Sequence, residues 1–110
     1  MVGLMKVYFI ATYGDIKKDK LGWLDDGGVR RVVGFYKDFA TAERAVLENC
    51  CDLYEDGYYK YAVIEELEDG LYPYCSKPKF YKWQGDIKTG GYKKIRRPKA
   101  TKGFFGFTIG

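Results

Sequence analysis

Two arginine pairs carry the chemistry that is easiest to recognise in this sequence. Arg30-Arg31 follows two glycines at 27–28, and Arg96-Arg97 lies in a lysine-rich stretch that ends at Lys99. Glycines let backbone N–H groups approach a phosphate, and guanidinium groups bind phosphate oxygens in bidentate pairs. All four arginines are therefore candidate ligands of a phosphorylated molecule. For the first pair the alternative is a loop that leads into a strand, with one arginine facing solvent. In the second pair, alternation along a strand would put only one arginine on a given sheet face.

Aromatic side chains can supply the flat wall that a nucleobase needs. They make up 18% of the chain, with 11 Tyr, 7 Phe and 2 Trp. The rings close to the second arginine pair in the sequence are Phe80, Tyr81, Trp83 and Tyr92. A stacking surface beside a fixed positive charge is typical of nucleotide sites, so we add Trp83, Phe104 and Phe105 to the predicted ligand-binding residues. An ordinary tyrosine-rich sheet face has the same composition, and this alternative stays open.

Residues suited to catalysis are scarce. The chain has no histidine and a single serine, Ser76, which excludes Ser-His and Cys-His nucleophiles and any His-ligated metal. Glu65 and Glu66 would point to opposite faces of a strand, and Asp25-Asp26 lack the spacing of a calcium loop. Cysteines 50, 51 and 75 form no C-x-x-C pair, which argues against zinc and favours reduced thiols in the cytoplasm. We expect a binding protein, not an enzyme, with no cofactor and no metal.

Charge is divided unevenly along the chain. Residues 1–70 hold nine Lys/Arg against fourteen Asp/Glu, whereas residues 71–110 hold ten Lys/Arg against Asp86 alone. A basic segment of this kind favours an anionic partner, although a solvated lysine-rich surface, or pairing of this segment with the acidic half of the chain, explains it equally well. The apolar runs are far shorter than the ~18 residues of a membrane span, so we expect a soluble cytoplasmic protein with no membrane contact.

Hydrophobic patterning predicts one domain over residues 1–110. We expect strands at 6–13, 29–36, 58–67, 79–84 and 92–96, with a bulge at Gly34 and a central strand at 58–67. A helix over 39–54, capped by Asp38, is predicted by apolar residues at spacings of three and four. The order ββαβββ indicates an α+β fold, a mostly antiparallel sheet of about five strands packed on one main helix. The apolar end, residues 103–110, should pack on its own domain or on another subunit, which favours a homo-oligomer.

Several stretches are similar to small proteins encoded by phages and prophages. They are Tyr8–Tyr13, Gly34–Phe39, Glu48–Glu55, Tyr58–Glu66 and Gly70–Pro73. In the composition of these stretches and in its length, the chain resembles the first family of Thoeris anti-defence proteins. That resemblance implies a homo-oligomer in the bacterial host cytoplasm that binds cyclic ADP-ribose signals or cyclic oligonucleotides without cleaving them. Two alternatives stay open: a small inhibitor that occupies the surface of a host defence protein, and a basic nucleic-acid-binding module.

Overall fold

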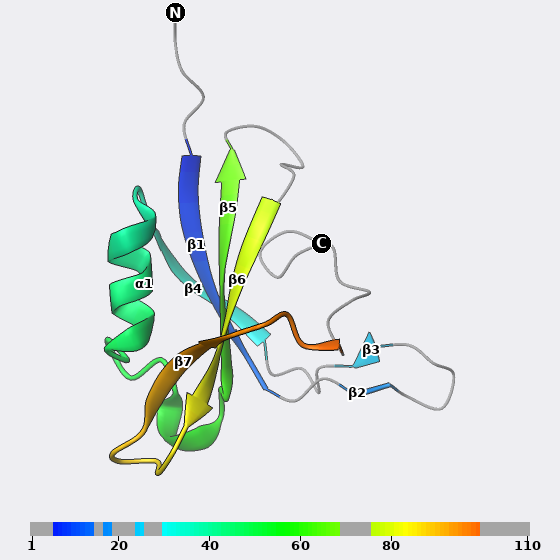
Figure 1. Cartoon of the computed structure of the whole chain (residues 1–110), viewed down its shortest axis with the longest axis vertical. Helices are drawn as coiled ribbons and strands as arrows, with labels where there is room; N and C mark the ends of the chain where they lie inside the picture. Colours follow the sequence, from blue (N-terminus) through cyan, green and yellow to red (C-terminus); the bar gives the residue numbers. More distant parts are fainter. Residues whose placement is uncertain (1–5, 15–16, 19–23, 26–29, 69–75, 100–110) are drawn as a thin grey trace, which may run out of the picture.

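The computed structural model describes residues 6–14, 17–18, 24–25, 30–68 and 76–99. Within them, a five-stranded antiparallel sheet of order β4-β1-β5-β6-β7 carries one α-helix, α1, on one face (Figure 1). The elements are β1 (Lys6–Tyr13), β2 (Lys17–Lys18), β3 (Leu24–Asp25), β4 (Arg30–Tyr36), α1 (Phe39–Leu47), the 3₁₀ turn η1 (Glu55–Gly57), β5 (Tyr61–Glu68), β6 (Ser76–Gln84) and β7 (Gly91–Ile95). The predicted α+β class and the ββαβββ order of the main sheet are confirmed. The short β2–β3 pair, which forms a separate two-stranded sheet, was not predicted.

The centre of the sheet is built from strands that are distant in the sequence. β1 pairs with β4 on one side and with β5 on the other, in a register that places Ile10 between Gly34 and Ile64. The register with β4 shifts after Ile10, which confirms the bulge predicted at Gly34. β5 lies in the middle of the sheet, as its continuous apolar centre predicts.

Helix α1 begins where the sequence predicts and ends earlier. Asp38 caps its first turn, because a carboxylate oxygen accepts a hydrogen bond of 2.9 Å from the Thr41 backbone N–H. The predicted end at Tyr54 is wrong, since α1 ends at Leu47 and the backbone then takes positive φ at Asn49, Cys51 and Asp52. Left-handed residues break the i→i−4 ladder and turn the chain back toward the sheet.

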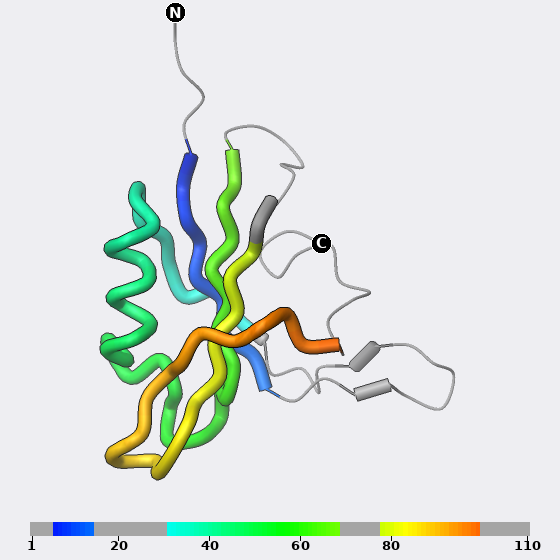
Figure 2. Tube along the Cα trace, viewed as in Figure 1, coloured from blue at the N-terminus to red at the C-terminus, as the bar shows by residue number. Residues whose placement is uncertain are grey.

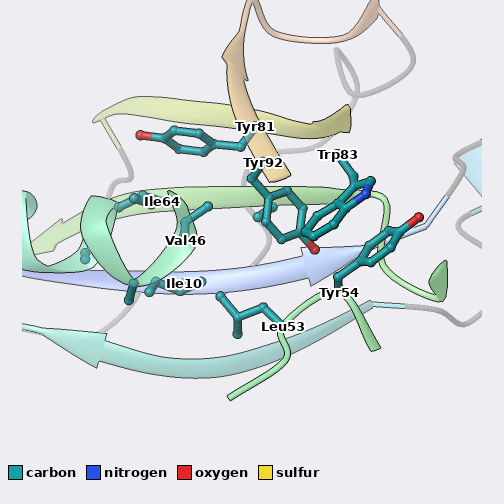
Figure 3. Close-up of a cluster of buried hydrophobic side chains, with 11 residues drawn as sticks. Ile10, Val46, Leu53, Tyr54, Ile64, Tyr81, Trp83 and Tyr92 are labelled. Carbon is teal, nitrogen blue, oxygen red and sulfur yellow. The ribbon is translucent and has the colours of Figure 1, made fainter. Parts of the chain in front are cut away.

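The main core lies between α1 and the sheet (Figure 3). Val46 of α1 packs with Ile10 and Ile64 of the central strands, and all three are buried. Tyr54 stacks on Trp83, with ring centroids 3.9 Å apart and planes within 3° of parallel, and Tyr92 meets both rings edge-on. The turn after α1 and the β6–β7 hairpin lie at the same end of the sheet (Figure 2). A hydrogen bond joins them, because the Tyr92 hydroxyl donates to the Tyr59 carbonyl.

A smaller cluster occupies the opposite face of the sheet. It contains Ala11, Tyr13, Val63 and Phe80, all buried. The Tyr13 ring stacks on that of Tyr61 at 5.0 Å. Because side chains alternate along a strand, Phe80 and Trp83 of β6 face opposite sides of the sheet, and this separation decides which predicted site residues can meet.

No helix within the described ranges is both long enough and apolar enough to cross a membrane.

Candidate functional site

The loop between β6 and β7 is held in one shape by the backbone of Asp86. Its carbonyl accepts a hydrogen bond of 2.7 Å from Gly90 N–H and another of 3.0 Å from the indole N–H of Trp83. Gly90 has no room for a side chain, because a Cβ there would lie 2.2 Å from the Gln84 carbonyl oxygen. Gly85 takes a positive φ of 90° that suits glycine. The loop is therefore a rigid feature tied to the core through Trp83.

A groove of about 550 Å³ lies between this loop and the end of α1. We call it the hairpin groove; it is lined by Leu47, by residues 84–86 and by residues 89–93. Its volume falls in the range of roughly 300 to 1,000 Å³ that is typical of small-molecule sites. Leu47, which is 45% exposed, offers an apolar wall, and the Lys93 ammonium supplies positive charge.

Lys93 also belongs to a pair of lysines on the sheet face opposite α1. Lys82 of β6 and Lys93 of β7 are direct cross-strand partners, and both are exposed. Neither forms an ion pair within the part of the chain that the structure describes. The Lys82 ammonium instead lies 5.8 Å from the centroid of the Tyr61 ring. Like charges directly opposite each other on one sheet face are destabilising, so an anion bound between them would relieve the repulsion.

Arg97 lies on the same side of the sheet as the lysine pair. Its guanidinium is 5.5 Å from the centroid of the Phe80 ring. Phe80 is only 2% exposed, so a ligand cannot stack on that ring directly. Arg97 itself is exposed and can present the outer face of its guanidinium to a base. Arg96 is also exposed.

Among the described residues, the structure does not bring Trp83 or Arg31 to this place. Trp83 faces α1, where it is buried and stacked on Tyr54, so the sheet separates it from Arg97. Arg31 donates to the Thr12 hydroxyl at 3.3 Å and to a Glu55 carboxylate oxygen at 2.9 Å. The side chain of Arg30, and all of Phe104 and Phe105, lie outside the described residues.

Arg31 has a clear structural role. Besides these two bonds, its guanidinium lies 4.2 Å from the centroid of the Tyr59 ring. It thereby ties β4 to the turn that follows α1. The two hydrogen bonds use two of the five guanidinium N–H donors, and Glu55 already supplies a counter-charge.

Sequence reasoning missed the hairpin groove and the lysine pair. The signal for the groove was the concentration of glycine at positions 85, 90 and 91 of one loop. The lysine pair depends on the register between β6 and β7, because a shift of one residue would move Lys93 to the other face.

The buried tyrosines cannot transfer protons at neutral pH. Burial raises the pKa of Tyr13, Tyr81 and Tyr92 well above the ordinary tyrosine value of 10.0, so their phenols stay protonated. Within the described ranges, no three His, Cys, Asp or Glu side chains cluster so as to hold a metal ion. The lysine pair offers cations that can bind an anionic group, and the groove offers amide groups and the apolar side chain of Leu47.

Comparison with known proteins finds no counterpart. No protein-family model matches the chain, and no curated protein and no solved structure matches it.

Proposed function

We propose that this protein binds a cyclic nucleotide signal at the hairpin groove and sequesters it without cleaving it. The observation that carries the proposal is a groove of nucleotide size lined by Lys93, which lies on the edge strand β7. Its cross-strand neighbour Lys82 lies outside the groove lining, on the face opposite α1, and neither ammonium has a carboxylate partner in the described structure. A phosphate placed between the two would form two charge-assisted hydrogen bonds.

The remaining parts of the groove suit the rest of such a ligand. Leu47 offers apolar contact to a base or ribose, while the Gln84 and Thr89 side chains offer hydrogen bonds. The rigid loop fixes these groups before the ligand arrives, which lowers the entropic cost of binding. An extended ligand with a second base would continue along the sheet toward Arg97, whose guanidinium can stack on it.

The resemblance to Thoeris anti-defence proteins supports the same proposal. A protein that only sequesters a signal needs no acid–base pair, which agrees with a chain that lacks histidine. In this proposal the protein acts in the cytoplasm of a bacterial host, as a homo-oligomer. The oligomeric state is accessible by light scattering of the purified protein.

The test is calorimetric titration with cyclic ADP-ribose isomers and with cyclic di- and trinucleotides. Replacing Lys82→Gln and Lys93→Gln together should weaken binding at least about 100-fold, since each charge-assisted bond to phosphate contributes roughly 1.5 to 3 kcal/mol. The matched control is Lys94→Gln, because position 94 pairs with Tyr81 and points to the other face. Bound nucleotide released by heating should have its original mass.

Two results would reject this proposal. One is that none of these nucleotides binds the wild-type protein. The other is that the double variant and Lys94→Gln bind the nucleotide equally well.

Strand β4 favours a second candidate function, the binding of a partner protein. It is an edge strand whose Val32 and Phe35 are 43% and 55% exposed. Such an edge can accept an extended segment as an added strand. Residues 30–37 contain three cations and no acid, so the matching segment would be acidic. Replacing Phe35→Glu should abolish binding of an acidic, strand-forming partner, because it removes an apolar contact and adds a like charge, and it should leave nucleotide binding unchanged.

A further inference from the structure

A second cavity lies on the α1 side, at the end of the sheet away from the hairpin. It has a volume of about 180 Å³ and is lined by Tyr8, Phe39, Ile64, Glu66 and Lys79. These residues come from β1, the start of α1, β5 and β6, so four elements that are distant in the sequence build it.

The centre of the cavity is apolar. The rings of Tyr8 and Phe39 meet edge to face, with centroids 6.0 Å apart and planes at 69°. Ile64, which is 1% exposed, closes the side toward the sheet. An aliphatic or aromatic group placed here would contact three apolar side chains.

Two opposite charges lie on the same cavity. Glu66 is oriented by the Tyr8 hydroxyl, which donates to a carboxylate oxygen at 3.0 Å, and Lys6 lies 3.8 Å from the same oxygen. This hydrogen bond raises the pKa of Tyr8, which keeps its phenol a donor. On the other side, the Lys79 ammonium forms no ion pair and no hydrogen bond within the described part of the chain. Glu66 and Lys79 therefore line one small apolar cavity without pairing with each other, since Glu66 contacts Lys6 and the Tyr8 hydroxyl instead.

We infer that this cavity binds a small zwitterion with an apolar body, that is, a free α-amino acid with an aliphatic or aromatic side chain. The ligand ammonium lies against Glu66, its carboxylate against Lys79, and its side chain against the Tyr8–Phe39 ring pair and Ile64. Its volume is below the roughly 300 Å³ of typical small-molecule sites, and Glu66 repels phosphate, so nucleotides are excluded. The inference is independent of the nucleotide proposal, because the two sites share no residue.

The test is titration of the ¹⁵N-labelled protein by NMR with L-leucine and L-phenylalanine. The backbone amides of Tyr8, Ile64 and Lys79 should shift. N-acetyl-leucine lacks the ammonium and leucinamide lacks the carboxylate, so each should bind at least tenfold more weakly than leucine.

Two variants test the contributions of Lys79 and Glu66 separately. Lys79→Gln should weaken leucine binding about tenfold, and it should not disturb the fold because the ammonium it removes has no partner in the described structure. The matched control is Lys82→Gln, on the other face of the same strand. Glu66→Gln should have an effect as large as Lys79→Gln, and if that variant fails to fold, the lysine variant still decides.

Three outcomes would overturn the inference. The cavity amides do not shift with either amino acid, or the acetylated and amidated compounds bind as well as leucine, or Lys79→Gln binds leucine with unchanged affinity.

Discussion

Replacing Gly90→Ala provides the sharpest test of the geometry around the candidate site. A Cβ at position 90 would lie 2.2 Å from the Gln84 carbonyl oxygen, 2.6 Å from that of Asp86 and 2.7 Å from the indole nitrogen of Trp83. Two of these atoms belong to the backbone, so the clash cannot be relieved by rotation of a flexible side chain. The loop must move, and the hydrogen bond from Trp83 to Asp86 must lengthen or break.

The expected loss of stability follows from these two effects. Overpacking costs about 1 to 3 kcal/mol, and a lost hydrogen bond adds about 1 kcal/mol, so Gly90→Ala should lower the free energy of unfolding by about 2 to 4 kcal/mol. For a domain of this size that is a fall in Tm of roughly 10 to 20 °C. Urea denaturation followed by tryptophan fluorescence measures it, and nucleotide binding at the hairpin groove should weaken in the same variant.

The neighbouring glycine is the control. A Cβ at Gly91 would meet nothing within 4 Å, so Gly91→Ala should leave the free energy of unfolding within about 0.5 kcal/mol of wild type. The reasoning fails if Gly90→Ala unfolds at the wild-type urea midpoint, or if the two variants lose equal stability.

Three further predictions concern the fold. Val46 is buried, so Val46→Ala should lower the free energy of unfolding by about 2 kcal/mol. Leu47 is half exposed, so Leu47→Ala should lower it by less than about 0.5 kcal/mol. Thermal denaturation measures both losses, and equal losses would contradict the packing described. The hydrogen bonds from Thr41 hold the pKa of Asp38 below its usual value, so the stability it contributes is present at neutral pH and is lost as pH falls through the folded pKa. Asp38→Ala should therefore lower Tm at neutral pH but not in strong acid, and a difference that persists in acid would exclude the capping role. Three buried tyrosines have a pKa raised above the unfolded value of 10.0, so their stabilising effect is complete below that pH and is lost as pH rises above it. They are Tyr13, Tyr81 and Tyr92. Their tyrosinate absorbance should appear together with the loss of circular dichroism, and ionisation of all tyrosines in a protein that stays folded would disprove this.

The strands were predictable because their signal is local. Residues 6–13 and 30–36 are rich in β-branched and aromatic side chains, and the structure places strands there. The end of α1 was not predictable from periodicity. Leu53 continues the apolar spacing of the helix and is buried, but a turn with left-handed residues brings it to the core. Burial at the expected spacing does not by itself specify helical backbone.

The candidate site was harder to predict, because it depends on pairings between strands. Alternation along β6 separates Phe80 from Trp83, so the stacking partners expected around Arg97 divide between the two faces. The contacts of Arg31 with Thr12, Glu55 and Tyr59 join three segments that only the tertiary structure brings together. Local sequence identifies the residue types of a site but not which of them become neighbours.

The pairing of β1 with β5 has a consequence for how the chain folds. Lys6 lies opposite Glu68 and Tyr13 opposite Tyr61, so closing this pair requires the two ends of a long loop to meet. Contacts of such high sequence separation slow folding. During synthesis on the ribosome, β1 can pair with β4 as an early hairpin, but the centre of the sheet cannot close until β5 has left the exit tunnel. Until then, the backbone hydrogen-bonding groups of β1 that later pair with β5 are exposed to other chains. The side chains of Ile10, Ala11 and Tyr13 in this segment are apolar, so we expect misfolding of this protein to start here.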